Sequence, residues 1–166
     1  MKSCVVIGMG RFGREVARRL CEFGCEVLAM DLHSELIQQI SGEVTHAVVA
    51  DAKDKEVLRT LDVQDFDCAI VAVGDNLADS VLTTMNLKEL NVPYIVCKAR
   101  DETHRQVLEK LGADRVVIPE QENAVRLARS LSSPNVLDYI ELSDEYGIVE
   151  TPTPRRWIGK TLRELN

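Results

Sequence analysis

Short runs of consecutive apolar residues alternate along the chain with segments in which apolar residues recur at helical spacing. Consecutive apolar positions are typical of strands that are covered on both faces, as in a parallel sheet flanked by helices. The apolar runs predict six strands, at Cys4–Gly8, Glu26–Asp31, His46–Asp51, Cys68–Val73, Tyr94–Ala99 and Arg115–Pro119. The segments between them predict helices at Phe12–Phe23, Ser34–Ile40, Lys53–Leu61, Leu77–Leu90 and Glu102–Leu111, with another after Pro119. This alternation predicts an α/β fold with a doubly wound, six-stranded parallel sheet.

The alternation ends after residue 133, where the pattern changes. The next residues predict a short helix at Val136–Ile140 and a short extended piece at Gly147–Glu150. Thr151-Pro152-Thr153-Pro154 indicates a stiff linker, because each proline restricts both itself and the residue before it. A tryptophan, Trp157, in so short a tail indicates the start of a second module or a docking contact.

Three glycines, Gly8, Gly10 and Gly13, form the pattern G-x-G-x-x-G between the first predicted strand and the first predicted helix. In this context the first glycine permits a tight turn, the second lets the backbone approach a pyrophosphate, and the third lets the helix pack against the sheet. The helix N-terminus then offers unpaired N–H groups and a partial positive charge to phosphates. The pattern predicts a Rossmann-type domain that binds a dinucleotide or an adenine nucleotide.

Two charged residues refine this site. Asp31 ends the second predicted strand, where a carboxylate accepts hydrogen bonds from ribose hydroxyls and repels a 2′-phosphate, which disfavours NADP against NAD, ATP or ADP. The alternative for Asp31 is a solvated residue or a helix N-cap. Arg11, inside the glycine turn, is expected to donate to a phosphate, and its alternative is an ordinary surface arginine.

Further candidates follow the ends of the other predicted strands, because ligands in this architecture bind outside the carboxyl ends of the strands. Glu120, after the sixth strand, is a candidate ligand of a divalent cation, Mg²⁺ or Ca²⁺, and its alternative is an acid that stabilises a helix N-terminus. The candidate binding residues are Gly8, Gly10, Arg11, Phe12, Gly13, Asp31, Leu32, Asp51, Ala52, Val73, Gly74, Asn76, Lys98, Arg100 and Glu120.

Composition narrows the class of protein. The 166 residues are 45% hydrophobic and carry a formal charge of −7, from 27 acidic against 20 basic residues. This balance disfavours a general nucleic-acid binder, which would carry a basic stripe to meet phosphates. No apolar run approaches the roughly 20 residues that span a bilayer, and the N-terminus lacks the pattern of a signal peptide. We therefore expect a cytoplasmic protein without direct membrane insertion.

The cysteines and histidines show no pattern of a redox or metal site. The five cysteines form no C-x-x-C pair and lie mostly within apolar runs, so we expect reduced packing residues. The three histidines, His33, His46 and His104, lack the spacing of metal ligands and are expected at the surface or at edges of elements.

Little of the chain remains for catalysis. The predicted nucleotide unit uses nearly everything up to residue 133, and no residues resemble a nucleophile with its base. We therefore expect a sensor, not an enzyme, in which the nucleotide changes the arrangement of a protein assembly. The alternative is a small NAD-dependent oxidoreductase or redox sensor whose site lies between subunits, and the fold alone does not decide between them.

Five stretches carry a resemblance to a known family. The chain resembles the RCK (regulator of potassium conductance), or TrkA-N, family, the cytosolic gating subunits of Ktr- and Trk-type potassium uptake systems, and above all the Ktr regulatory subunit. The stretches that match are Val6–Gly13, His46–Ala52, Thr83–Leu90, Val107–Glu120 and Asn135–Tyr146.

The resemblance implies a regulatory subunit that forms homodimers within an octameric ring beneath a membrane potassium channel or transporter subunit. ATP and ADP, or NAD and NADH, would bind the cleft and change the shape of the ring. Arg11 would contact terminal phosphates across a subunit boundary, Asp31 the ribose, and Lys98 the phosphate side. Glu120 would lie near a divalent cation close to the γ-phosphate. The protein would be cytoplasmic, at the inner face of the membrane through its partner.

The resemblance also divides the chain. It implies a Rossmann domain at residues 1–133, a crossover and dimerisation segment at 134–151, and a linker with the start of a truncated C-terminal module at 152–166. Asp51 departs from the asparagine typical of the family, so its contact with the nucleotide is the least defined of the set.

Overall fold

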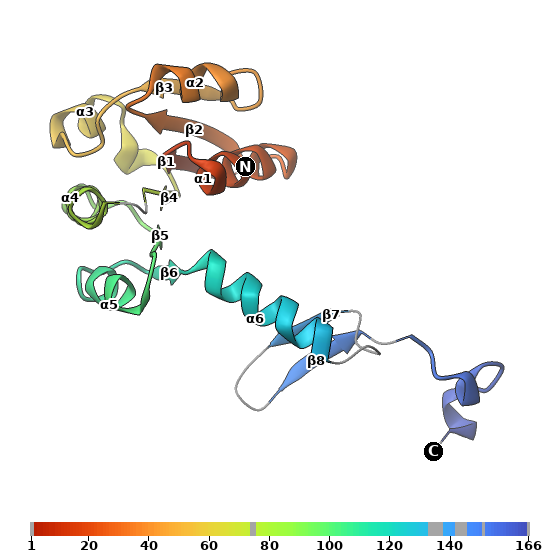
Figure 1. Cartoon of the computed structure of the whole chain (residues 1–166). Helices are drawn as coiled ribbons and strands as arrows, with labels where there is room; N and C mark the ends of the chain where they lie inside the picture. Colours follow the sequence, from red (N-terminus) through yellow and green to blue (C-terminus); the bar gives the residue numbers. More distant parts are fainter. Residues whose placement is uncertain (1, 74–75, 133–137, 142–145, 151, 166) are drawn as a thin grey trace. The chain divides into compact units, whose positions relative to one another are not determined.

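The computed structural model describes residues 2–73, 76–132, 138–141, 146–150 and 152–165 (Figure 1). The chain folds as two compact units, Met1–Ile118 and Pro119–Asn166.

The first unit is built on a parallel six-stranded sheet, as predicted. Its strands follow the order β3-β2-β1-β4-β5-β6, and every neighbouring pair runs parallel. The order reverses between β1 and β4, and this is the point where ligands bind in doubly wound sheets. The strands are β1 (Ser3–Ile7), β2 (Glu26–Asp31), β3 (His46–Val49), β4 (Cys68–Val71), β5 (Ile95–Lys98) and β6 (Arg115–Val117).

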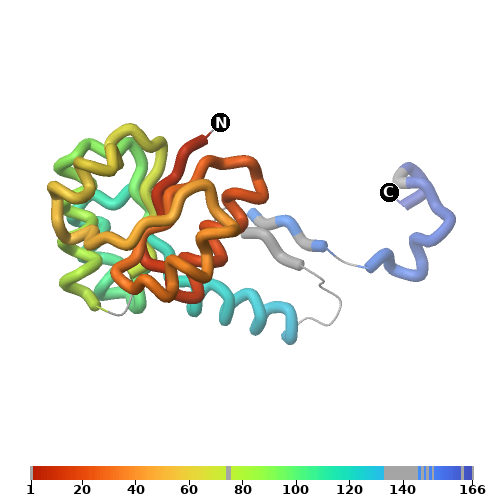
Figure 2. The backbone as a smooth tube through the Cα atoms, turned by 90° about the horizontal axis from the view of Figure 1, so that it is seen from above, coloured from red at the N-terminus to blue at the C-terminus, as the bar shows by residue number. Residues whose placement is uncertain are grey.

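Helices cover both faces of this sheet (Figure 2). α1 and α2 pack on one face, and α3, α4 and α5 pack on the other. The helices are α1 (Arg11–Glu22), α2 (Ser34–Ile40), α3 (Lys55–Thr60), α4 (Leu77–Glu89) and α5 (Glu102–Lys110), with a 3-10 turn η1 (Val63–Asp65) after α3. The predicted helices are confirmed, with shifts of one or two residues at their ends.

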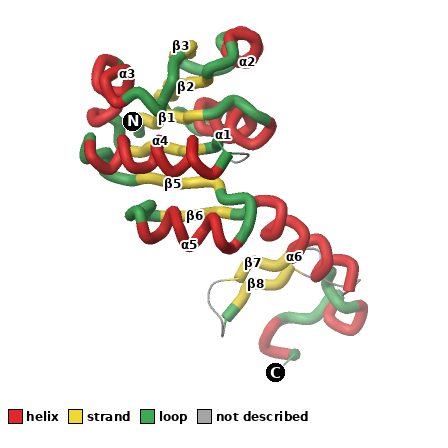
Figure 3. Tube along the Cα trace, turned by 60° about the vertical axis from the view of Figure 1, so that its left-hand side comes forward, coloured by secondary structure: helices red, strands yellow, loops and turns green. Residues whose placement is uncertain are grey.

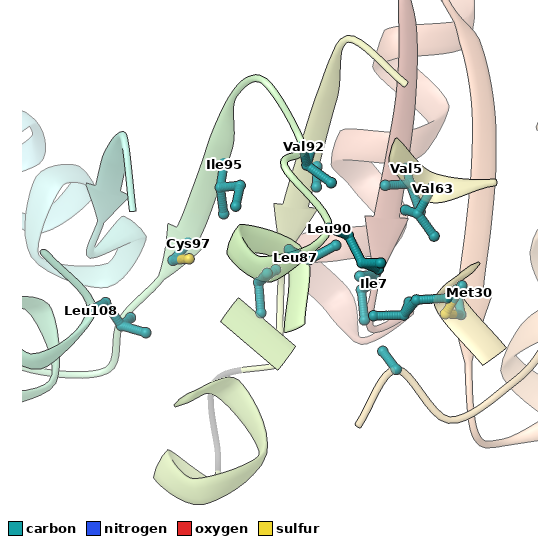
Figure 4. Packing of buried hydrophobic residues seen from close by; sticks show 14 of the residues in the cluster. Val5, Ile7, Met30, Val63, Leu87, Leu90, Val92, Ile95, Cys97 and Leu108 are labelled. Atoms are coloured by element: carbon teal, nitrogen blue, oxygen red, sulfur yellow. The ribbon is translucent and has the colours of Figure 1, made fainter. Parts of the chain in front are cut away.

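Two apolar clusters form the core, one on each face of the sheet. Neighbouring residues of β1 contribute to opposite clusters: Val5 packs with the α3–α5 side and Val6 with the α1–α2 side. Figure 4 shows the larger cluster, in which Leu87 of α4 and Leu108 of α5 lie over the strands. This double burial explains why the strands read as consecutive apolar residues.

The helices that follow β3, β4 and β5 begin at side-chain caps. Asp54, Asn76 and Asp101 each accept a hydrogen bond from a backbone N–H two or three residues further on. Such caps satisfy donors that the helix itself leaves unpaired, and they fix where each loop at the carboxyl edge of the sheet ends. α1 starts at Gly10 and has no side-chain cap.

The second unit comprises α6 (Pro119–Ser132), a two-stranded antiparallel sheet of β7 (Asp138–Glu141) and β8 (Gly147–Glu150), and two 3-10 turns, η2 (Arg155–Trp157) and η3 (Leu162–Glu164). Within the described residues, no helix is long and apolar enough to cross a membrane.

One sequence prediction in this unit is wrong. The short helix expected at Val136–Ile140 is strand β7 from residue 138 onward, whereas Val136 and Leu137 lie outside the described residues. Five residues close barely one helical turn, and such a turn is costly to nucleate in isolation. Pairing with β8 satisfies the backbone of this segment instead, with Tyr139 in register with Val149. The extended piece predicted at Gly147–Glu150 is confirmed as β8.

Candidate functional site

A cleft of about 320 Å³ opens at the carboxyl edge of the sheet, at the reversal of strand order between β1 and β4. This volume lies within the range of small-molecule sites, about 300–1,000 Å³. Of the predicted binding residues, those that line it are Gly8, Gly10, Asp31, Leu32, Asp51, Ala52, Val73 and Asn76. The structure also brings in residues that the sequence analysis did not select: Ile7, His33, Leu36, Ala50, Lys53, Ala72, Asp79 and Thr83.

The glycine turn has the geometry that each glycine predicts. Gly8 has a φ of +96°, in the region that favours glycine, and a Cβ there would lie 3.1 Å from the backbone of Ala72 and Val73. A Cβ on Gly13 would overlap the carbonyl oxygen of Gly8, so this position allows close packing of α1 on the sheet. A Cβ on Gly10 would meet no atom within 4 Å. Gly10 therefore borders open space in the cleft, where a ligand can come close to the protein backbone.

The N-terminus of α1 is suited to an anion. Gly10 is its N-cap and carries no side chain, and the first turn contains no acidic residue. The first intrahelical bond runs from the N–H of Arg14 to the carbonyl of Gly10 at 3.0 Å. The preceding N–H groups have no partner within the helix and point out of its positive end. A phosphate placed here meets several donors and no acidic side chain from the first turn of α1.

Asp31 is fixed beside the glycine turn. Its Oδ2 accepts a 2.6 Å hydrogen bond from the N–H of Met9, and its Oδ1 accepts from the N–H of His33 and lies 2.8 Å from the Nδ1 of that histidine. Burial raises the pKa of Asp31, but these hydrogen bonds outweigh it and hold the pKa below its ordinary value. The side chain is therefore an ionised acceptor in the cleft.

The opposite walls of the cleft are joined by an ion pair. Lys53, after β3, places its Nζ 3.1 Å from Oδ1 of Asp79 on α4. The hydrogen bond to Asp79, with a further contribution from Asp51, raises the pKa of Lys53. The backbone carbonyl of Lys53 also accepts a 2.9 Å bond from Asn86 of α4. This pair could not be predicted from sequence pattern, because Lys53 and Asp79 are 26 residues apart and belong to no motif.

Five of the other predicted residues do not line the cleft: Arg11, Phe12, Gly13, Lys98 and Arg100. Arg11 is exposed, and Lys98 lies over the ring of Phe12, with its Nζ 5.8 Å from the ring centroid. This contact joins two predicted residues from β5 and α1 in a cation–π geometry. The Nε of Arg100 donates to Asp101, at the start of α5, at 2.9 Å.

Two predicted residues cannot be compared with the cleft. Gly74 lies outside the described residues. Glu120 lies in the first turn of α6, in the second unit. Among the described residues, no group of three His, Cys, Asp or Glu side chains could hold a metal ion.

The histidine prediction is wrong at one position. His33 and His46 are exposed, but His104 is only 1% exposed, between α5 and α4. Its buried partner is 24 residues away, so spacing alone could not reveal it. Two cysteines, Cys4 and Cys97, are buried as expected of packing residues, and burial raises their pKa to about 12 and about 11.

The family model of the TrkA-N domain matches residues 4–119. The chain belongs to the TrkA-N family. The matched range contains every residue that lines the cleft, and it ends one residue before Glu120. The resemblance found in the sequence is thereby confirmed.

Two relatives within this family are highly similar to the chain. Ktr system potassium uptake protein A of Bacillus subtilis (strain 168) is 46% identical over 165 residues, which are 99% of this chain and 74% of the relative. Ktr system potassium uptake protein C of the same organism is 44% identical over 165 residues, with 99% and 75% covered. The TrkA-N chain is therefore grouped with Ktr potassium uptake proteins.

Solved structures share its fold. The NAD(P)-binding domain of an exopolyphosphatase-related protein from Archaeoglobus fulgidus has a TM-score of 0.70 at 23% identity, covering 80% of this chain and 98% of that one. The GsuK channel bound to NAD has a TM-score of 0.62 at 18% identity, covering 70% and 21%. GsuK bound to ADP has the same score and identity, covering 70% and 31%. At these identities the likeness establishes the Rossmann-type fold of this TrkA-N chain.

Proposed function

We propose that this chain is a nucleotide-sensing regulatory subunit that gates a membrane potassium channel or transporter. The observation that carries the proposal is the cleft at the glycine turn, in a chain 46% identical to a Ktr potassium uptake protein over almost its whole length. Binding in the cleft would alter the arrangement of the assembly and thereby the conductance of the partner. A ligand shifts such an equilibrium only by binding one arrangement better than the other.

The proposed ligands are ATP and ADP, or NAD and NADH. These molecules share an adenosine and a diphosphate, which match the ionised Asp31 and the uncapped start of α1. The similar fold of GsuK has been solved with NAD and with ADP, which supports both classes of ligand.

The proposed contacts follow from these elements. The N–H groups at the start of α1 would bind the diphosphate, and Asp31 would accept from the ribose hydroxyls. Arg11, exposed beside Gly10, would reach a terminal phosphate, and Lys98 would add positive charge on the same side of the sheet. Glu120 would bind Mg²⁺ or Ca²⁺ near the terminal phosphate.

The proposed assembly is a homodimer within an octameric ring at the cytoplasmic face of the membrane, beneath the transporter subunit. The residues at 134–151 would link two subunits, since β7 and β8 form a small sheet within the second unit. Light scattering of the purified chain with and without ATP tests this assembly. A monomer under both conditions would contradict it.

We propose that the nucleotide is bound and not turned over. The alternative, a small NAD-dependent oxidoreductase, is not favoured, because two relatives at 46% and 44% identity are potassium uptake proteins. Chromatography of the nucleotide after long incubation with the protein tests this point. Conversion of ATP or NADH at the rate of an enzyme would support the alternative.

The experiment that tests the function is calorimetric titration of ATP, ADP, NAD and NADH into the purified chain, with and without Mg²⁺. We expect at least one of the pairs ATP/ADP and NAD/NADH to bind with a micromolar or lower dissociation constant. This corresponds to a binding free energy of about −8 kcal/mol or more negative. Preference for ATP and ADP supports a Ktr-type switch, and preference for NADH supports a Trk-type sensor. Potassium flux into vesicles that hold the transporter subunit should then depend on the preferred nucleotide. Absence of binding by all four nucleotides would refute the proposal.

A further inference from the structure

A buried histidine joins two helices on one face of the Rossmann unit. His104 lies in the first turn of α5, is 1% exposed, and places its Nε2 2.7 Å from the hydroxyl of Ser80 on α4. Figure 3 shows α4 and α5 side by side over the strands, and both belong to the cluster of Figure 4. This hydrogen bond is therefore a buried polar contact between the two helices.

The neighbours of the ring indicate its protonation state. The backbone N–H of Arg100 donates to Nδ1 at 3.4 Å, so Nδ1 acts as an acceptor. The single proton of the neutral imidazole is then on Nε2 and is donated to Ser80. The hydroxyl of Ser80 in turn donates to the carbonyl of Leu77 at 3.1 Å. The neutral ring thus accepts a hydrogen bond from the N–H of Arg100 and donates one to Ser80. In a protonated ring, the Nδ1–H group would instead face the N–H of Arg100, and two donors would oppose each other.

This contact lies directly behind the nucleotide cleft. Ser80 follows Asp79, and Asn76, Asp79 and Thr83 of the same helix end line the cleft. Ser80 is fully buried, and its carbonyl accepts a 2.7 Å bond from Thr84. One side of the first turns of α4 therefore borders the ligand space, and the other side is held by His104.

We propose that His104 is a positioning residue of the nucleotide cleft: its neutral ring holds the start of α4 in place, and protonation releases that helix end and weakens nucleotide binding. This role rests on the proposed function, because it makes the affinity of that same cleft depend on pH. His104 does not line the cleft and acts through Ser80.

The surrounding charges set the direction of the effect. The charged groups near the ring are Asp101, the N-cap of α5, and Arg100 in the loop after β5, which are paired with each other. On α4 the nearby acid, Asp79, is paired with Lys53. Burial lowers the pKa of His104, the charge of Asp101 opposes this, and the charge of Arg100 adds to it.

The sign follows from this lowered pKa. The folded protein holds the His104 proton less tightly than the unfolded chain, in which histidine titrates near pH 6.5. The contribution of the neutral ring is therefore fully present above about pH 6.5 and is lost as the pH falls below that value. Acid should loosen α4 first and reduce nucleotide affinity.

The test uses NAD as the probe, because its pyrophosphate does not titrate between about pH 5.5 and about pH 7.5. We expect the dissociation constant of the wild-type chain to rise at least about five-fold over that range as the pH falls. His104→Gln keeps an N–H donor for Ser80 but cannot be protonated, so it should bind NAD like the wild type at the higher pH and lose the pH dependence. His104→Ala should bind more weakly at both values.

Two histidine controls accompany these variants. His46→Gln, at an exposed position outside the cleft, should leave affinity and pH profile unchanged. His33→Gln alters a residue that lines the cleft, and its pH profile should keep the slope of the wild type. A flat wild-type profile, a slope retained in His104→Gln, or a slope removed by His33→Gln would each overturn the role of His104.

Hydrogen exchange separates this role from the proposed function. Exchange of the α4 amides from Ser80 to Thr84, corrected for the intrinsic rate, should accelerate in acid in the wild type and not in His104→Gln. If NAD, ATP and ADP all fail to bind at any pH, the proposed function fails and this measurement still decides the role of His104. Equal acceleration in both proteins would overturn it.

Discussion

The carboxylate of Asp31, at the end of β2, accepts a 2.6 Å hydrogen bond from the backbone N–H of Met9, inside the turn that follows β1. The same turn is held from the other side by the N–H of Gly8, which donates to the carbonyl of Met30 at 2.8 Å. The acid expected to bind ribose therefore also fixes the glycine turn. Structure and ligand binding depend on one side chain, and a change at Asp31 should affect both.

Asp31→Ala should lower the free energy of unfolding by about 2 kcal/mol, because it leaves the N–H of Met9 without its charged partner. The substitution should also raise the dissociation constants of NAD and ATP at least about ten-fold. Thermal melting and calorimetry measure the two effects. Since hydrogen bonds hold the pKa of Asp31 low, its stabilising effect is present above about pH 4 and is lost as the pH falls further. Wild-type binding by the variant would show that Asp31 is only structural.

Two glycines of the turn should separate binding from folding. Gly10→Ala places a methyl group in open space at the cleft, so it should cost less than about 1 kcal/mol of stability. It should nevertheless abolish nucleotide binding, because the methyl group occupies the position of the pyrophosphate. Gly13→Ala should lower the free energy of unfolding by at least about 2 kcal/mol, because its Cβ would overlap the Gly8 carbonyl. Melting curves measure the stability of both variants, and calorimetry measures their nucleotide affinity. An unchanged affinity in Gly10→Ala would contradict the predicted contact between Gly10 and the pyrophosphate.

Arg11→Ala should weaken the binding of ATP about ten-fold and that of NAD less than about two-fold, because only ATP offers a terminal phosphate to the guanidinium. The matched control is Arg19→Ala on the same helix, where the arginine pairs with Glu15 and Glu22. This control should not change the ratio of the two affinities. Equal losses of ATP and NAD in Arg11→Ala would remove the proposed contact.

Cysteine alkylation should follow burial. Cys4 and Cys97 should react with iodoacetamide at least about 100-fold more slowly than in the unfolded chain, because burial both blocks access and raises their pKa to about 12 and about 11. The half-buried Cys21 is the internal comparison and should react faster. Mass spectrometry of peptides after timed labelling measures the rates, with a sample in denaturant as control. Fast labelling of Cys97 in the folded protein would contradict its burial.

Much of the Rossmann unit could be predicted from the sequence, because its strands are buried on both faces and its turns carry glycine. The pattern at Gly8, Gly10 and Gly13 specifies local backbone geometry, and the structure agrees with it at each position. The position of Asp31 in the cleft could be predicted for the same reason, because the end of β2 lies beside the glycine turn in this fold.

The rest depends on contacts between distant elements. The Lys53–Asp79 pair and the His104–Ser80 bond join residues 26 and 24 positions apart, and neither forms a motif. In the sequence, His104 lies among polar residues at the start of a helix and therefore resembles a surface residue. Its burial depends on the packing of α4 against α5. At Val136–Ile140 the segment is too short for periodicity to distinguish a turn of helix from a strand.

The start of α1 differs from those of α3, α4 and α5, which close their first turns with their own side chains. The start of α1, which borders the cleft at Gly10, is thus left for a ligand to complete. A ligand that binds only the folded unit at one hundred times its dissociation constant stabilises that unit by about 2.7 kcal/mol. Thermal shift of the unmodified chain with each nucleotide added separately is therefore a direct, label-free measure of which nucleotide binds the cleft most tightly.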